Sequence, residues 1–152
     1  MTVTTKTDPR YDKIVEFLKS GGTITTGVHG TEGAATYDDG PSIAEIASAA
    51  EFGLGQLQRS WLREWFDSNR SEVEAQLGKQ LRKAMSEGKS FEWAAKRVAL
   101  WIQADIQKRI VQGISPANAE ITILNKGAST PLVDNGLFKA AIVSYFEGSK
   151  VS

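Results

Sequence analysis

The chain contains no cysteine, which excludes disulfides, thiolate metal sites and thiol chemistry from its 152 residues. Its single histidine, His29, lies in a glycine-rich stretch, where a surface role is expected and a Ser-His-Asp triad is not. No apolar run approaches the ~20 residues of a membrane-spanning helix, and residues 1–10 lack the apolar centre of a signal peptide. We therefore expect a flexible N-terminal leader over residues 1–10, one domain over residues 11–152, and no membrane partner.

Net charge is also absent, because 18 basic residues balance 18 acidic ones, but the charges are spread unevenly. Residues 1–52 hold 4 basic and 8 acidic residues, a net charge of −4, whereas residues 53–113 hold 11 and 7, a net charge of +4. The basic residues of the middle stand among Trp and Leu at helical spacing. A solvated helix face is the ordinary interpretation of this pattern, and a nucleic-acid surface is the alternative.

Apolar residues recur at helical spacing in four segments, which have clear start and stop signals. One start signal is the capping box that Ser42 forms with Glu45. Trp93 and Trp101 lie off the apolar stripe of the last segment, so this helix is expected to bury more than one side, within the fold or against another subunit. The predicted helices span residues 11–19, 43–53, 60–85, with a possible break near Asn69, and 90–113.

Strand patterns are fewer. Residues 23–28 are rich in β-branched side chains, and residues 34–37 are their expected hairpin partner across a glycine-rich loop. Ile142–Phe146 alternates as a final strand, while Ser115-Pro116 predicts a short helix to Leu124 and Asp134 a cap for another. The sequence therefore predicts an α+β fold, with a small, mostly antiparallel sheet packed against two long helices plus short helices.

Acidic residues offer few candidates for chemistry. Glu32, Asp38 and Asp39 match neither calcium-loop spacing nor a two-metal pattern, and adjacent acids before Gly-Pro are common turn formers. A cell-wall hydrolase would need a carboxylate pair such as Glu45 and Glu51, but Glu45 is accounted for by its cap. We therefore predict that the protein is not an enzyme and has no catalytic, cofactor-binding or metal-binding residues.

The segment Arg59-Ser60-Trp61-Leu62-Arg63 has the residue types that are enriched in interface cores, since Trp and Arg make large contacts with little loss of entropy. Packing of Trp61 in the core beside Leu62 and Trp65, with solvated arginines, is an equal alternative. The predicted subunit interface comprises Arg59, Trp61, Arg63, Trp93 and Trp101.

Three stretches, in this order, resemble the tail-completion or neck proteins of tailed bacteriophages, also called virion morphogenesis proteins. Glu51-Phe52-Gly53 matches the family's Glu-Phe-Gly without change, and residues 59–63 match an Arg-Pro-Phe-Leu-Arg-like segment with Ser60 and Trp61 at the Pro and Phe positions. Pro131 to Leu137 matches the family's Pro-Leu-Ile-Asp-Thr-Gly-x-Leu segment with Val133 for Ile and Asn135 for Thr, and Phe138 follows. Ser60 can cap the long helix that follows it.

The resemblance implies a structural virion protein of the head–tail junction, assembled in the host cytoplasm. Its copies would form a ring, expected to be a hexamer, between the head connector or portal-side proteins and the tail terminator or tail-tube proteins, and DNA would pass through without specific binding. We expect the acids Glu32, Asp38 and Asp39 to face the lumen. The alternative is a small DNA-binding or regulatory module that contacts phosphates through Arg82, Lys83, Lys96, Arg97, Lys108 and Arg109.

Overall fold

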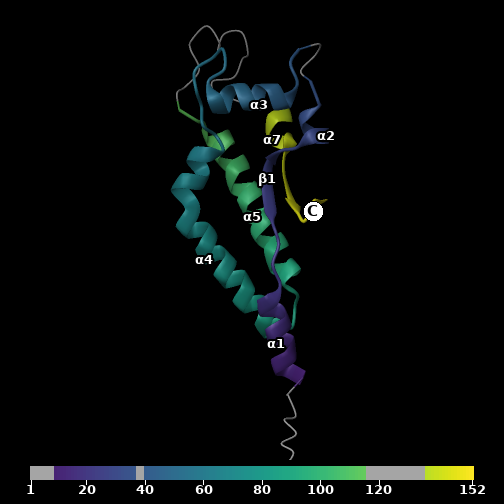
Figure 1. Cartoon of the computed structure of the whole chain (residues 1–152). Coiled ribbons are helices and arrows are strands. Elements are labelled where there is room, and N and C mark those ends of the chain that lie inside the picture. The colour runs from purple at the N-terminus through teal and green to yellow at the C-terminus, as the bar shows by residue number, and fades with distance from the viewer. Residues whose placement is uncertain (1–8, 37–39, 116–135) are drawn as a thin grey trace, which may run out of the picture.

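The computed structural model describes residues 9–36, 40–115 and 136–152 (Figure 1). The fold is α+β, as predicted, with a small antiparallel sheet and two long helices. In the described ranges the helices are α1 (Pro9–Lys19), α2 (Gly30–Gly33), α3 (Ile43–Phe52), α4 (Arg63–Glu87), α5 (Phe91–Gln112) and α7 (Leu137–Ala141), and the strands are β1 (Ile24–Val28), β2 (Ile142–Phe146) and β3 (Ser149–Lys150).

The two long helices, α4 and α5, form an antiparallel hairpin with a short connection and clear stop and start signals. Gly88 ends α4 in the left-handed region, with a φ of 66°, and the Ser90 hydroxyl caps α5 by accepting from the Trp93 amide at 3.1 Å. α4 begins at Arg63, later than predicted, and the possible break near Asn69 does not occur. The helix continues through Asn69, whose side-chain amide donates to the backbone carbonyl of Trp65, one turn earlier, at 2.7 Å.

The sheet pairs segments far apart in the chain. β1 runs antiparallel to β2, from Ile24 opposite Phe146 to Val28 opposite Ile142, and β3 adds to the other edge of β2. The predicted hairpin between residues 23–28 and 34–37 is therefore wrong. Helix α2 occupies most of the intervening loop, and period-two alternation identifies a strand without identifying its partner.

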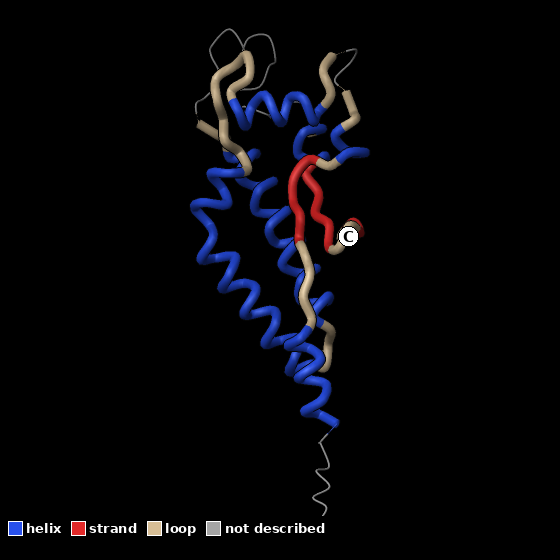
Figure 2. Tube along the Cα trace, in the orientation of Figure 1, coloured by secondary structure: helices blue, strands red, loops and turns tan. Residues whose placement is uncertain are grey.

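The main core lies around α5, with α4 on one side and the β1–β2 pair on the other (Figure 2). Ser144 of β2 is fully buried and donates to the Ala99 carbonyl of α5 at 2.9 Å, while its oxygen lies 2.7 Å from the Thr26 hydroxyl of β1. This polar group is satisfied, and it ties the sheet to the helix. The apolar side chains of this core include Ile43, Trp61, Trp65, Val98, Ile102, Ile106, Ile110, Phe138 and Ile142.

Three predictions concern the ends of elements. α1 begins at Pro9, so the helix takes in the last two residues of the expected leader. The helix expected after Ser115-Pro116 and the cap expected at Asp134 lie outside the described residues. α7 follows Gly136, which has a φ of 73°, and leads directly into β2. Among the described residues, no helix combines the length and apolarity needed to cross a membrane.

Candidate interaction site

Residues 51–63, between the last turn of α3 and the first residue of α4, form a compact corner that holds apolar side chains in solvent. We call it the α3–α4 corner. Phe52, Leu54 and Leu57 are 61%, 62% and 61% exposed, respectively. Large apolar groups gathered on one short segment mark an interaction site more often than isolated ones do. These leucines follow no helical or strand period, so only their presence among Gly and Gln could have indicated them.

Glu51 anchors the corner. Its side chain is buried, and its two carboxylate oxygens accept from the backbone amides of Leu62 at 3.0 Å and Arg63 at 3.2 Å. These amides belong to the start of α4, where a helix has unpaired donors and a positive dipole end. Glu51 therefore caps α4 from α3, and the expectation that Ser60 caps this helix is wrong.

Backbone geometry closes the corner. Gly53 ends α3 with a φ of 70°, a conformation that favours glycine, and a Cβ there would also lie only 3.0 Å from the Cβ of Gln58. The Arg59 amide donates to the Ala50 carbonyl at 2.7 Å, and the Gln58 side chain donates to the Glu51 carbonyl at 3.1 Å. The segment is thus held by hydrogen bonds while its leucines stay exposed.

Trp61 belongs to the core, so the prediction that it is an interface anchor is wrong. It is 3% exposed, its indole donates to the Ala47 carbonyl at 3.1 Å, and its ring meets Phe138 edge-on with centroids 5.3 Å apart. Arg59 is also buried within the chain. Neither side chain can present an open surface to a neighbour, because each already packs inside its own subunit.

Arg63 is the predicted interface residue that stays accessible at this corner. Its side chain is 55% exposed, lies 3.7 Å from Glu51 through its Nε atom, and places its guanidinium 5.9 Å from the centre of the Phe52 ring. An arginine over an exposed aromatic is a common component of interface cores. Arg63 and Phe52 therefore form one side of the exposed surface.

The corner contains the first two stretches on which the family resemblance depends, and it contacts the residue that follows the third. Glu51 binds the Leu62 and Arg63 amides, which joins the first stretch to the second, and Trp61 packs on Phe138, next to Leu137 at the end of the third. Pro131–Asn135 lie outside the described residues. The contacts that join the stretches are capping and packing contacts.

The two remaining predicted interface residues lie on α5. Trp93 is half-buried. The Arg97 guanidinium lies 5.0 Å from the centre of its ring, and the Lys83 ammonium lies 6.0 Å from the same ring centre. Trp101 is also half-buried and packs against Trp65 with ring centroids 6.0 Å apart. Each thus has part of its surface inside the subunit and part at its boundary.

Among the acids expected to face a lumen, Asp38 and Asp39 lie outside the described residues. Glu32 on α2 is paired with Lys150 on β3 and also accepts from the Tyr145 hydroxyl at 3.4 Å. The hydrogen bond from Lys150 holds the pKa of Glu32 below its usual range. Glu32 therefore ties α2 to the sheet edge, which is a structural role within the chain.

The basic residues of the DNA-binding alternative are partly neutralised. Lys96 pairs with Glu92 at 2.7 Å, Arg109 with Glu64 at 2.8 Å and Lys83 with Glu87 at 3.7 Å, while Arg97 donates to Gln80 at 3.2 Å. Three of the six cations thus have an acidic neighbour. Lys and Arg side chains that are paired with acids contribute less to phosphate binding than unpaired ones do.

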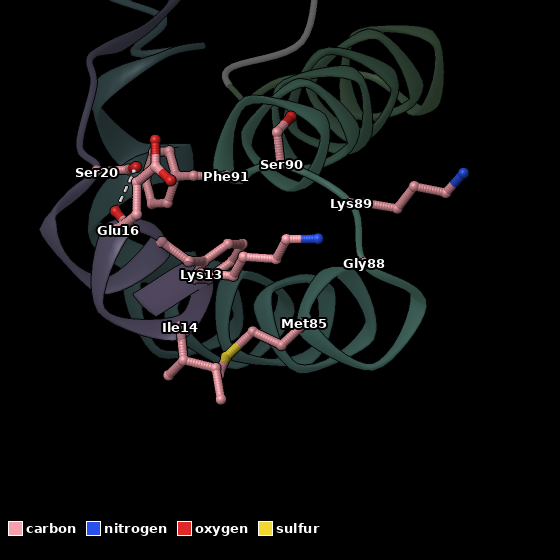
Figure 3. Close-up of a pocket in the computed structure, with 10 residues that line it drawn as sticks. Lys13, Ile14, Glu16, Ser20, Met85, Gly88, Lys89, Ser90 and Phe91 are labelled. Atoms are coloured by element: carbon pink, nitrogen blue, oxygen red, sulfur yellow. Dashed lines mark hydrogen bonds between the residues drawn. The ribbon is translucent and has the colours of Figure 1, made fainter. Parts of the chain in front are cut away.

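A second apolar surface lies at the opposite end of α4, where α1 leans on the α4–α5 turn (Figure 3). A groove of about 590 Å³ separates them; Ile14 approaches Met85 at one edge, and Lys13 extends toward the turn. Phe17 meets Phe91 with ring centroids 6.2 Å apart. Beyond these residues α1 leaves Tyr11 and Leu18 60% and 70% exposed.

The described residues contain no group of three or more His, Cys, Asp or Glu side chains placed to hold a metal ion. The carboxylate of Glu45 accepts from the Ser42 backbone amide at 2.8 Å and completes the predicted capping box, so both this carboxylate and that of Glu51 bind backbone amides.

Comparison with protein-family models, curated proteins and solved structures finds no significant match to this chain.

Proposed function

We propose that this chain is a structural protein of the phage head–tail junction, a neck or tail-completion subunit whose ring joins the head connector to the tail and lets DNA pass. The observation that carries the proposal is the α3–α4 corner. Two of the stretches that resemble the neck family, residues 51–53 and 59–63, are joined there through Glu51, and Trp61 packs on Phe138, the residue that follows the third stretch. These contacts support a surface that exposes Phe52, Leu54 and Leu57.

The exposed side chains suit an interaction between proteins. Phe52, Leu54 and Leu57 each have more than half of their surface in solvent, although removing such groups from water is favourable. A hydrogen-bonded loop with Gly53 at its base loses little entropy when it is bound, because it is already ordered. The corner is therefore the surface that we assign to a neighbouring virion protein.

Ring formation also needs a second, different surface, since subunits in a ring meet head to tail. The groove between α1 and the α4–α5 turn provides one, with Ile14, Met85 and Phe91 in its lining. It lies at the C-terminal end of α4 and the corner lies at the N-terminal end. The 25 residues of α4 separate the two by about 37 Å at 1.5 Å per residue.

The genes beside the coding sequence give a direct test, because portal, connector and tail-tube genes are expected there. In a phage that carries the gene, its deletion should yield filled heads and separate, complete tails by electron microscopy. Joined, infectious particles from the deletion strain would contradict the proposal.

A surface variant tests the corner itself. Leu54→Ser with Leu57→Ser should leave the melting temperature near that of the wild type and reduce the yield of joined particles by at least tenfold. Val111→Ser, which alters an apolar residue 50% exposed on α5, is the matched control and should assemble normally. Equal yields from both variants would remove the corner from the junction.

A further inference from the structure

Helix α4 packs on α5 through one face and leaves the opposite face in solvent, at the outer edge of the molecule (Figure 1). The buried and half-buried positions 65, 69, 73, 76, 80 and 84 form the inner stripe. A second stripe at helical spacing lies about half a turn away. We call it the outer stripe; it comprises Glu64, Asp67, Ser71, Glu74, Gly78, Arg82 and Met85, and it is exposed except at Gly78, which is half-buried.

Small residues, Ser71 and Gly78 with Ala75 beside them, flank Glu74 at the centre of this face. Glycine is among the least favourable residues inside a helix. Among the residues that the structure describes nothing demands it, because a Cβ on Gly78 would meet only the Arg82 side-chain end, Nη1, at 3.3 Å, and that end is flexible. A second helix that packs closely on α4 would require a small residue here, because helices approach to 8–10 Å according to the side chains between them.

Charge along α4 is segregated. Residues 64–74 contain four acids and one base, a net charge of −3, whereas residues 79–89 contain four bases and one acid, a net charge of +3. Compensation of the helix dipole acts over the terminal turns and does not explain the charges near the centre. Within the described part of the chain, no ion pair involves Asp67, Glu74, Lys79 or Arg82.

We propose that a second copy of this chain docks on the outer stripe, with its α4 antiparallel to the first and crossing it between Glu74 and Ala75. A two-fold axis at this point places Ser71 opposite Gly78, Asp67 opposite Arg82 and Glu74 opposite Ala75. The acidic half of each helix then faces the basic half of the other, and the small residues Ser71 and Gly78 meet on either side of the crossing. Such a contact is isologous and closes at two copies.

The pair does not depend on the head–tail role, because a ring uses two unlike surfaces and this contact uses one. It is expected to be weak. Exposed charge pairs add little affinity, although they set orientation, so a Kd of about 10 µM or more is expected. Added salt should weaken it further, since the screening length falls from about 10 Å at 0.1 M to about 3 Å at 1 M.

Charge exchange tests the contact by sedimentation at about 50 mM salt. Asp67→Lys with Glu74→Lys changes the net charge of residues 64–74 from −3 to +1, and Lys79→Glu with Arg82→Glu changes that of residues 79–89 from +3 to −1. Each double variant alone should lose at least tenfold in self-association, and an equimolar mixture should form heterodimers more tightly than the wild type pairs. The control is Lys108→Glu with Lys139→Glu, which alters two exposed cations on α5 and α7 and should dimerise as the wild type does.

A mixture that stays monomeric while circular dichroism shows both variants folded would overturn the proposal. So would equal losses in the control. The head–tail role would stand in either case, because it is judged by particle joining.

Crosslinking tests the antiparallel geometry, and the absence of native cysteine makes it clean. Ala75→Cys lies at the crossing and should form an intermolecular disulfide within minutes under mild oxidation. Ser86→Cys, equally exposed on α4, should not, because its two copies would lie about 35 Å apart at opposite ends of the pair. Equal crosslinking at both positions would contradict the antiparallel crossing.

Discussion

Replacing Glu51 should destabilise the α3–α4 corner by removing the acceptor that caps α4. The carboxylate accepts two amide donors at the start of α4, at 3.0 and 3.2 Å, and its side chain is nearly buried. Loss of one capping acceptor costs about 0.5–2 kcal/mol, and a hydrogen bond to a charged group contributes about 1.5–3 kcal/mol. The contact with the half-exposed Arg63 adds little. We therefore expect Glu51→Ala to lower the free energy of unfolding by about 2–3 kcal/mol.

Thermal unfolding measures this effect. For a chain of this size 1 kcal/mol corresponds to about 2–4 °C, so the melting temperature should fall by roughly 5–10 °C. Glu51→Gln keeps one acceptor oxygen and should lose about half as much. Glu74→Ala, which removes an exposed glutamate from α4, should stay within ~0.5 kcal/mol of the wild type. A Glu51→Ala protein with an unchanged melting temperature would refute the capping role.

Further results are expected from other parts of the molecule. Trp61→Ala should cost about 3–5 kcal/mol of stability, because it empties a core site beside Phe138; a melting temperature near that of the wild type would contradict its placement. Duplex DNA should show no measurable binding at about 50 mM salt, and binding that falls steeply with added salt would favour the nucleic-acid alternative. The pairing of Glu32 with Lys150 stabilises the fold above the ordinary pKa of a glutamate and is lost as pH falls through the lowered pKa of Glu32. Glu32→Gln should therefore reduce the loss of stability between neutral and acidic pH, and identical pH profiles would count against this pair.

The helices of the fold could be predicted because their signals are local. The Ser42 capping box, the Gly53 and Gly88 stops and the apolar period of α5 are each encoded within a few turns, and the structure confirms them. The partner of β1 could not be predicted, because Thr26 meets Ser144 across 118 residues and an alternating pattern does not indicate which strand will pair with it.

The candidate site divides in the same way. Residue type indicated that Trp61 and Arg63 mattered, but type does not say whether a tryptophan is buried, and the burial depends on Phe138, 77 positions later. The Glu51-Phe52-Gly53 stretch drew attention to Glu51, but it did not indicate that Glu51 caps a helix that begins 12 residues away. The exposure of Leu54 and Leu57 follows only once the corner is closed around Gly53.

The pairing of β1 with β2 also sets the order in which the chain can fold. Closing a loop of 118 residues costs roughly 2.4 kcal/mol more entropy than closing a hairpin of about eight, by the logarithmic dependence on loop length. On a ribosome, α3, α4 and α5 emerge before β2 exists, so the helical hairpin can form early while β1 waits without a partner. The sheet is then the slow step, and β1 is the edge that a nascent chain exposes longest.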